Sequence, residues 1–343
     1  MKIIVLQEGL DNSLLLRAFK AKNDEFYTRY EDIEEELKYY KSQFKNKTVY
    51  CNCDNPFWSN FFFYFVDNFN KLGLKKLISS GLNSVKVEIN RIDDNYFNKS
   101  KIIKLMRKIK RDLNRNNPEK KVSNKFIDLN LSIDDRGEKF SYSSEISKES
   151  LKKCDIVVTN PPFSLFRDFI NLLFEFNKDF LIIGSNLACS LKNLFPKIKE
   201  GEINIGMTSP GIFINPEGEE RRVRTYWYST LKSSEEKEFI KLKNKYSRMD
   251  YPEYKNFKAI NVDSIKKIPK DYYGIQGVPI NFLFKYNPNQ FKLIGVLAKS
   301  LVPEKLRKDY TPSNKKLKIN QGIIKRDGEE INLFTRILIK KRR

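Results

Sequence analysis

The sequence predicts an α/β protein with a doubly wound, mostly parallel sheet. Short apolar runs that end in polar or turn-forming residues alternate with segments that have helical apolar spacing. This alternation continues from residue 45 to about residue 230, which suits one large sheet. With 343 residues, 40% of them hydrophobic and 31% charged, the chain is typical of a globular protein with a sizeable core.

The first strand–helix–strand unit is predicted around residues 30–80. A helix is expected first, because Ile33, Leu37, Tyr40 and Phe44 recur at helical spacing. The next segments predict, in order, a buried strand, a loop, a helix that ends at Gly73 and a second strand: KTVYC, NCDNPFWSN, FFFYFVDNFNKLG and LKKLISS. This order is the outline of a parallel α/β unit.

The alternation resumes after a less regular middle segment, residues 84–140, where an insertion is one interpretation. The later segments predict a strand, a helix, a strand, a helix and a short strand: CDIVVT, SLFRDFINLLFEF, KDFLIIGSN, SLKNLFPKI and EINIGM. Further strands are expected in RRVRTYWYSTL, in GVPINFLFKYNPNQFKLIGVLA around a Pro-Asn turn, and in LFTRILIKKRR.

The charge balance favours a polyanionic partner. Lys and Arg total 65 against 43 Asp and Glu, a formal net charge of +22. Nucleic acid is the usual partner for such an excess, although a lysine-rich solvated surface is the alternative. The basic residues 101–125 and 301–343 are open to both interpretations.

Composition also narrows the chemistry. The chain has no histidine, which excludes the Ser-His-Asp triad and a His-ligated metal. Its four cysteines lie in or beside apolar runs and predict buried thiols in a reducing compartment, without a zinc site. With no apolar run near 20 residues and no signal-peptide cleavage pattern, we expect a cytoplasmic protein with no membrane partner.

The stretch DIVVTNPPF, residues 155–163, ends an apolar strand with Asn160 and two prolines. Ligands bind at such strand ends in open α/β sheets. Pro161 and Pro162 stiffen the backbone and donate no N–H, so the Asn160 amide oxygen and the Pro161 carbonyl can each accept from an exocyclic amine. Phe163 could stack on a ring such as a flipped adenine. The alternative is a turn that ends a core strand, with Phe163 packed inward.

This motif resembles the D/N/S-P-P-F/Y/W tetrapeptide of amino-group methyltransferases that use S-adenosylmethionine (SAM). The wider chain is similar to the EcoRI-type adenine-specific DNA methyltransferase family. The resembling segments follow that family's order: KNDEFYTRYEDIEEEL, VYCNCDNPFWSNFFFYF, LGLKKLI, DIVVTNPPFSLFRDF, FLIIGSN, GVPINFLFKYNPNQFKLIG and TRILIKK. The resemblance implies a SAM-binding catalytic domain at residues 22–230 and a basic, sheet-completing target-recognition region at 231–343.

The resemblance also implies site residues. The catalytic set is Asn160, Pro161, Pro162 and Phe163. The implied SAM contacts are Phe26, Tyr27, Thr28, Asn52, Cys53, Asp54, Pro56, Ser59, Asn60 and, more weakly, Ser79. For Asp54 and Ser59, turn formation and helix capping are the alternative roles. Trp227 and Tyr226 are the implied contacts of the flipped base, with an ordinary aromatic strand as the alternative.

The function expected from the resemblance is methylation of the exocyclic amine of a flipped adenine in double-stranded DNA. SAM is the methyl donor, no metal is needed, and a companion restriction endonuclease acting separately is one expected context. An RNA adenine or other amino-group methyltransferase is a first alternative, because the same acceptors suit any planar amine. A non-catalytic nucleic-acid-binding relative is the second, supported by Ser141 and Ser143 where related enzymes tend to have an acidic residue.

Overall fold

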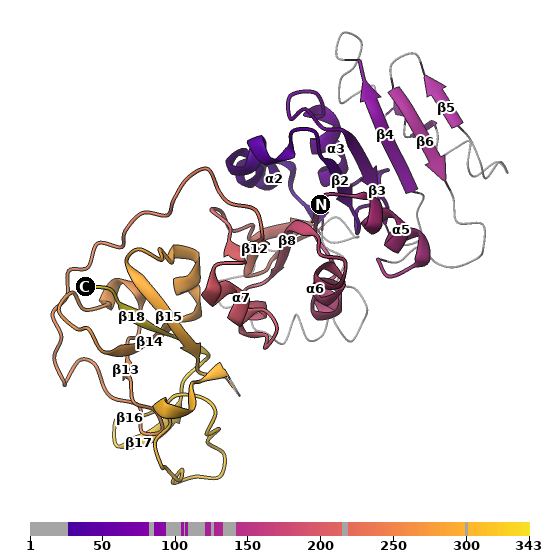
Figure 1. Ribbon diagram of the computed structural model, residues 1–343. Coiled ribbons are helices and arrows are strands. Elements are labelled where there is room, and N and C mark those ends of the chain that lie inside the picture. The colour runs from indigo at the N-terminus through magenta and orange to yellow at the C-terminus, as the bar shows by residue number, and fades with distance from the viewer. Residues whose placement is uncertain are drawn as a thin grey trace. The chain divides into compact units, whose positions relative to one another are not determined.

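The structure is a computed structural model that describes residues 27–81, 86–93, 104–105, 107–108, 121–124, 127–132, 142–214, 219–298 and 301–343, with backbone alone for 121–124 and 127–132. It divides into two compact units (Figure 1). Unit 1 comprises the described residues up to Ser185 together with Gly206–Ser234, and unit 2 comprises Asn186–Ile205 together with Glu235–Arg343. Phe26 and Ser141 lie outside the described residues, as does most of the basic segment 101–125.

Unit 1 is built on a large sheet whose strands run in the order β5-β6-β4-β3-β2-β7-β8-β12. The strand bounds are β2 Thr48–Cys51, β3 Lys76–Ser79, β4 Lys86–Ile92, β5 Lys121–Asn124, β6 Ile127–Ser132, β7 Ile156–Thr159, β8 Asp179–Ser185 and β12 Thr225–Ser229. The sequence therefore predicted the α/β class and the central strands. The segment 84–140 contributes strands β4, β5 and β6 to one side of this sheet.

The sheet is mixed, whereas the sequence predicted a mostly parallel one. Strands β3, β2, β7 and β8 pair in parallel. Strand β4 runs antiparallel to β3, and β12 runs antiparallel to β8. The link from Ser79 to Lys86 explains the first reversal, because a parallel crossover needs about a dozen residues or more. Apolar alternation marks strands but carries no information about their direction.

Helices cover both faces of the central strands. Their bounds, with the 3-10 helices η1 and η2, are α2 Tyr30–Leu37, η1 Lys38–Phe44, α3 Asn60–Asp67, α5 Glu145–Lys153, η2 Phe163–Leu165 and α6 Phe166–Glu175. Side chains alternate along β2: Val49 and Cys51 join the core cluster that contains α2 and α3. The Tyr50 hydroxyl instead donates to Ser147 Oγ of α5 at 3.3 Å. The strand ends are thus held between two helical layers.

A small sheet of unit 1 carries the first predicted cofactor residues. Its order is β1-β10-β11, with bounds Tyr27–Thr28, Ile212–Ile214 and Glu220–Arg222. Thr28 is registered opposite Phe213 of β10. The Asn60 amide at the start of α3 donates to the Thr28 carbonyl at 2.8 Å, so β1 is fixed to the helix that follows β2.

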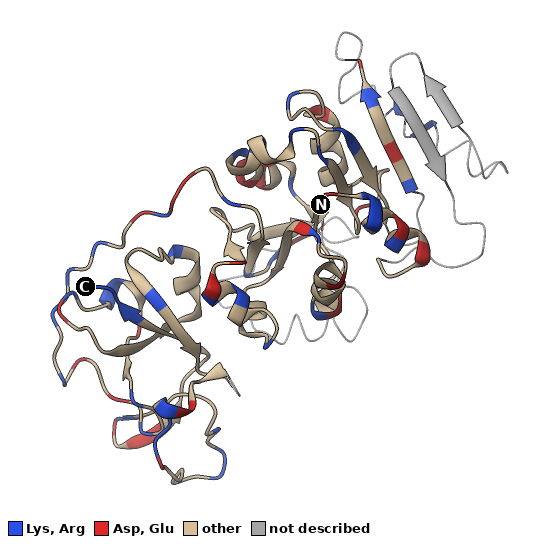
Figure 2. Ribbon diagram, viewed as in Figure 1, with Lys and Arg blue, Asp and Glu red and all other residues tan. Residues whose placement is uncertain are grey.

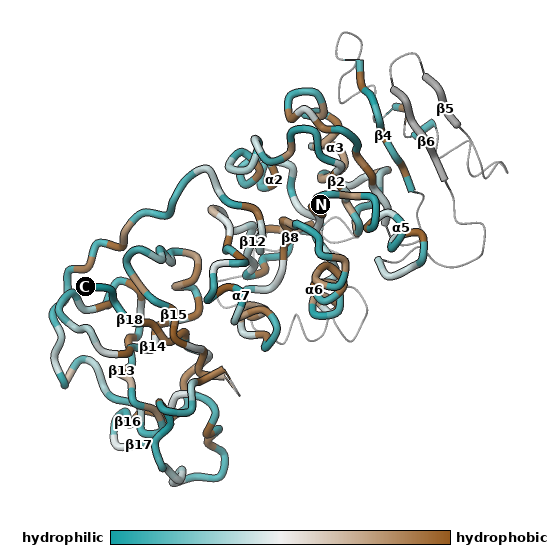
Figure 3. Tube along the Cα trace, in the orientation of Figure 1, coloured by the Kyte–Doolittle hydropathy of each residue, from teal (hydrophilic) through white to brown (hydrophobic). Residues whose placement is uncertain are grey.

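Unit 2 has a four-stranded sheet in the order β13-β14-β18-β15 and a separate hairpin, β16-β17. The element bounds are η3 Asn186–Ser190, α7 Phe195–Glu200, β9 Asn204–Ile205, β13 Ile260–Asn261, η4 Ile265–Lys267, β14 Ile275–Pro279, η5 Ile280–Lys285, β15 Phe291–Val296, η7 Glu304–Leu306, β16 Ile323–Arg326, β17 Glu329–Asn332 and β18 Arg336–Lys341. The strands predicted around the Pro-Asn turn both form, but β18 pairs between them. Their apolar residues are the brown stretches of β14, β15 and β18 (Figure 3).

The described residues were compared with the requirements of a membrane-spanning helix and of a metal site. No helix there is long and apolar enough to cross a membrane. No group of three or more Cys, Asp or Glu side chains in the same part of the chain is placed to hold a metal ion.

Candidate active site

The predicted cofactor and catalytic residues meet at the point where the strand order reverses. Strand β2 has β3 on one side and β7 on the other, and both pairs are parallel. The carboxyl ends of β2 and β7 therefore lie next to each other. Residue Asn52 follows β2, and Asn160 follows β7. In open α/β sheets ligands bind at this kind of topological switch point.

Asp54 is the centre of a hydrogen-bond network at this point. It is 6% exposed. Ser59 Oγ donates to Asp54 Oδ1 at 2.7 Å, and the Thr159 hydroxyl donates to Asp54 Oδ2. The Cys53 backbone N–H donates to Thr159 Oγ1 at 3.0 Å. Both oxygens of the Asp54 carboxyl group thus already accept hydrogen bonds from this chain.

The loop between β2 and α3, residues 52–59, is also fastened to the end of β3. The Asp54 N–H donates to the Ser80 carbonyl at 2.9 Å, and Ser79 Oγ donates to the Asp54 carbonyl at 2.6 Å. A Cβ on Gly81 would lie 2.7 Å from the Asn55 nitrogen, so a residue without a side chain is needed there. The glycine that permits this close approach, Gly81, follows β3, and the loop of residues 52–59 contains no glycine itself.

Ser59 caps helix α3, as the alternative interpretation of the sequence allowed. Its hydroxyl accepts from the Phe61 N–H at 3.1 Å while donating to Asp54. Pro56 is buried in the same loop. Ser59, Ser79 and Asp54 are therefore occupied in holding the loop, and Asn60 is occupied with Thr28.

Among the predicted cofactor residues that the structure describes, two buried side chains keep unsatisfied polar atoms. Asn52 is 2% exposed, and no hydrogen-bond partner for either its Oδ1 or its Nδ2 is found among the described residues. Thr28 Oγ1 has none there either, and Thr28 is 4% exposed. An unsatisfied buried polar group costs about 1–3 kcal/mol. Such atoms are expected where a polar ligand completes the bonding.

The tetrapeptide Asn160–Phe163 links β7 to helix α6. Asn160 is half-buried and Pro161 is buried, and the Pro162 carbonyl accepts from the Leu165 N–H at 3.0 Å. Phe163 is 7% exposed, and its ring lies edge-on to Phe213 with centroids 6.0 Å apart. The ring therefore packs inward, which is the alternative that the sequence left open. Stacking of Phe163 on a base would require a different ring position.

Trp227 lies in the core of unit 1. It has 0% exposure, and its indole packs edge-on against Phe61 at 5.9 Å. Tyr226 is 4% exposed, and its ring lies 6.3 Å from that of Tyr228. A base could reach either ring only if this packing opened. The aromatic pattern of TYWY is explained by the fold, whether or not a base also uses it.

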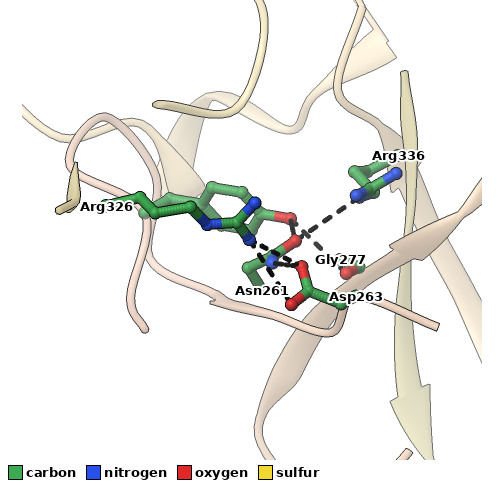
Figure 4. Close-up of polar contacts among 6 residues, drawn as sticks. Asn261, Asp263, Gly277, Arg326 and Arg336 are labelled. Atoms are coloured by element: carbon green, nitrogen blue, oxygen red, sulfur yellow. Dashed lines mark hydrogen bonds and ion pairs between the residues drawn. The ribbon is translucent and has the colours of Figure 1, made fainter. Parts of the chain in front are cut away.

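A second polar cluster lies in unit 2 and extends from its core to its surface (Figure 4). The Tyr254 hydroxyl donates to Asn261 Oδ1 at 3.0 Å, and Asn261 Nδ2 donates to Asp263 Oδ1 at 2.8 Å. Arg326 at the end of β16 donates to both Asp263 oxygens, at 3.2 and 3.4 Å. Arg336 Nε also donates to Asn261, at 3.4 Å. The Arg326 guanidinium is thus braced from the core, and its side chain is 47% exposed.

Comparison with known proteins identifies the family. A family model described as adenine-specific methyltransferase EcoRI matches residues 14–342. The chain is 41% identical over 311 residues to the Escherichia coli protein named Type II methyltransferase M.EcoRI, covering 82% of this chain and 89% of that protein. The chain belongs to the EcoRI family of adenine-specific methyltransferases. This confirms both the resemblance and the predicted activity, DNA adenine methylation.

Two further relatives of this EcoRI-family chain span nearly its whole length. Type II methyltransferase M.MgeORF184P of Mycoplasma genitalium is 33% identical over 347 residues, 95% of this chain and 98% of the relative. Type II methyltransferase M.MpnI of Mycoplasma pneumoniae is 32% identical over 348 residues, with 95% and 97% covered. No solved structure matches the chain.

Some site residues of this EcoRI-family enzyme were not predicted from its sequence. Thr159 and Phe213 are the main ones, since the first bonds the cofactor loop and the second packs on Phe163. Thr159 could have been suspected, because it directly precedes the tetrapeptide at a strand end. Phe213 gave no signal, because its contact with Phe163 joins segments about fifty residues apart.

The burial of Asp54 predicts a pH effect on stability. Desolvation raises the pKa of Asp54 to about 7, although the Thr159 and Ser59 hydroxyls act in the opposite direction. Between about pH 4 and pH 7 the folded protein keeps a proton that the unfolded chain loses. The Asp54 contribution to the free energy of unfolding therefore falls as pH rises through this window, by up to about 4 kcal/mol.

Chemical denaturation of the wild type and the Asp54→Asn variant at pH 4 to 8 measures this contribution. The asparagine side chain does not titrate, so the stability difference between the two proteins should change in favour of the variant as pH rises. A difference that stays constant across this range would contradict the raised pKa.

Proposed function

We propose that the strand ends at the β2–β7 switch point form one site that binds SAM and methylates the exocyclic amine of an adenine flipped out of double-stranded DNA. The supporting observation is the hydrogen bond from the Cys53 N–H to Thr159 Oγ1, at 3.0 Å. It joins the loop with the implied cofactor residues to the strand that presents Asn160. Cofactor and target amine would then share one edge of the sheet.

The residues present fit SAM. Its carboxylate, ammonium and ribose hydroxyls supply acceptors and donors for buried polar atoms. Asn52 and Thr28 would hold such groups, because their side chains have polar atoms with no bonding partner among the described residues. Tyr27 precedes Thr28 in the same short strand and would flank the same end of the site. When bound, SAM supplies a methyl group activated by a positively charged sulfur.

The chain's own contribution to the chemistry is to hold the amine. Asn160 Oδ1 and the Pro161 carbonyl would each accept one N–H and so fix the direction of the nitrogen lone pair. As the nitrogen forms its bond to carbon it becomes positive, and both acceptors stabilise this charge more than they stabilise the neutral amine. The extra proton then leaves to solvent. No general base is needed, which agrees with the absence of histidine from the sequence.

Trp227 and Tyr226 could contact the flipped base only if the packing around their buried rings opened. Flipping an adenine costs a few kcal/mol of unstacking, and an aromatic side chain commonly offsets part of that cost. The buried positions of both rings mean that such a role requires movement of β12 or of the residues packed on it.

Residues 235–343 are proposed as the main DNA-recognition surface. They are about a third of the chain but hold 26 Lys and Arg against 12 Asp and Glu, a net of +14 out of the total +22. Figure 2 shows these basic residues spread over several strands and loops of unit 2. Phosphate contacts by such residues supply affinity and position, whereas base contacts supply specificity.

Arg326 is the expected contact that can be tested most clearly. Its bracing by Asp263 limits the rotamer freedom that DNA binding would otherwise remove. We expect Arg326→Ala to weaken DNA binding by about 1–3 kcal/mol. Fluorescence anisotropy with a cognate duplex measures this effect. Lys148→Ala is the control, because Lys148 pairs with Glu145 on the surface of unit 1. Equal affinities for Arg326→Ala and the wild type would remove Arg326 from the DNA surface.

The proposed function is tested by the identity of the methylated product. Methyl-labelled SAM is incubated with the protein and with either unmethylated duplex DNA or duplex RNA, and the nucleosides are then separated. We expect labelled N6-methyladenine from DNA. Label from RNA alone would favour the first alternative. Tight DNA binding with no label from either polymer would favour a non-catalytic binding protein. A companion endonuclease stays a prediction that this assay does not address.

A further inference from the structure

The hydroxyl of Thr159 connects two parts of the site that act on different substrates. Its oxygen accepts from the Cys53 N–H at 3.0 Å, and its proton goes to Asp54 Oδ2. The first partner lies in the loop after β2, where SAM is proposed to bind. The next residue in the chain is Asn160, which is proposed to hold the adenine amine. One buried side chain, 0% exposed, therefore spans the boundary between cofactor and target.

The Asp54 carboxyl group is already satisfied within the chain. Ser59 Oγ donates to its other oxygen at 2.7 Å, and that serine also caps α3. Its backbone N–H and carbonyl are bonded to Ser80 and Ser79 at the end of β3. Asp54 thus joins the ends of β2, β3 and β7 with the start of α3. Each Asp54 carboxyl oxygen thus already accepts one hydrogen bond that fixes the loop, whereas neither polar atom of the Asn52 side chain has a hydrogen-bond partner among the described residues.

From this network we infer that Thr159 and Asp54 are positioning residues, which hold the SAM-binding loop in register with Asn160 without touching SAM themselves. This inference rests on the proposed function and alters one of its parts, because the family resemblance implies that Asp54 contacts the cofactor. Register matters because methyl transfer needs donor carbon and acceptor nitrogen at about 3–3.5 Å, and an error of about 1 Å can cost roughly 100-fold in rate.

The inference predicts a combined kinetic defect. A cofactor contact such as Asn52 should affect SAM binding, and an amine acceptor such as Asn160 should affect the chemical step. Thr159→Val keeps the shape of the side chain but removes its hydroxyl. It should therefore do both: we expect a SAM Kd about tenfold higher and a single-turnover rate lower by about 10- to 100-fold. Thr159→Ser restores the hydroxyl and should recover most of both losses.

Unit 1 provides a matched control. Thr230 Oγ1 accepts from the Phe180 N–H at 2.9 Å and donates to Asp179 Oδ1 at 3.0 Å. This is the same backbone–threonine–aspartate arrangement, but it lies at the start of β8 and the end of β12. The start of β8 is at the edge of the sheet opposite the carboxyl ends of β2 and β7, where the proposed site lies. Thr230→Val should lower stability without changing the SAM Kd or the single-turnover rate.

The experiment combines calorimetry with SAM, single-turnover methylation of duplex DNA and denaturant unfolding for these variants. A folded Thr159→Val variant with wild-type Kd and rate would overturn the inference. Equal kinetic losses in Thr230→Val, or a failure of Thr159→Ser to recover, would overturn it as well.

If Thr159→Val does not fold, Asp54→Asn replaces it. Asparagine keeps the shape of the side chain but loses one acceptor, and the same combined defect is expected. If the wild type binds SAM but methylates nothing, the proposed function fails, and the SAM Kd still tests whether Thr159 holds the loop.

Discussion

Replacing Asn160 by alanine should lower the rate of methyl transfer by about 10²- to 10³-fold while leaving the SAM Kd close to that of the wild type. The amide oxygen would stabilise the amine nitrogen as it becomes positive, and loss of one such preorganised partner has an effect of this size in other enzymes. The half-buried position of Asn160 makes a large loss of stability unexpected. Single-turnover kinetics on duplex DNA, with SAM calorimetry on the same preparation, separates the chemical step from binding.

Asn160→Asp is the informative partner variant. A carboxylate keeps an acceptor in the same place, so we expect it to retain more activity than Asn160→Ala. An alanine variant whose rate stays within about threefold of the wild type would show that the amine is held elsewhere, and the roles assigned to the tetrapeptide would have to be abandoned.

Trp227→Ala should lower the free energy of unfolding by about 3–5 kcal/mol, because it removes a fully buried indole from the core of unit 1. The residue packs on Phe61 of α3 and is registered opposite Ile183 of β8, so the cavity would lie between a helix and the sheet. Trp227→Phe keeps most of the volume and should cost much less. Denaturant unfolding followed by circular dichroism measures these differences.

The chain contains one further tryptophan, which serves as the control. Trp58 is 44% exposed, so Trp58→Ala should change stability by no more than about 0.5 kcal/mol. If Trp227→Ala unfolds like the wild type but fails to methylate DNA, the indole acts on the flipped base and not in the core. That result would restore the role implied by the family resemblance.

The sequence predicted the central part of the fold because its signals are local. The runs TVYC and IVVT are short, apolar and followed by turn-forming residues, and both are strands as expected. Strand direction was not predictable in the same way. Whether β4 returns antiparallel depends on the short link after Ser79, and the alternating apolar residues of KVEINRI mark a strand without giving its direction.

The candidate site shows the same division. Residue types at strand ends indicated where the site lies, because Asn52 and Asn160 directly follow apolar runs. Which side chains are left available to a ligand was not visible in the sequence. From the sequence alone, Asp54 and Asn52 are equally suited to bind SAM. Only the structure shows that the Asp54 carboxyl group accepts hydrogen bonds from Ser59 and Thr159. The burial of Trp227 likewise depends on contacts between distant segments.

The central claim is that SAM binds at the end of β2, beside the catalytic tetrapeptide. Titration calorimetry of SAM into the wild type and Asn52→Ala tests it most directly, with Asn160→Ala as the control for general damage to the site. We predict that Asn52→Ala raises the SAM Kd by tenfold or more, about 1.4 kcal/mol, while Asn160→Ala leaves it nearly unchanged. A folded Asn52→Ala variant with wild-type SAM affinity would contradict the placement of the cofactor at this switch point.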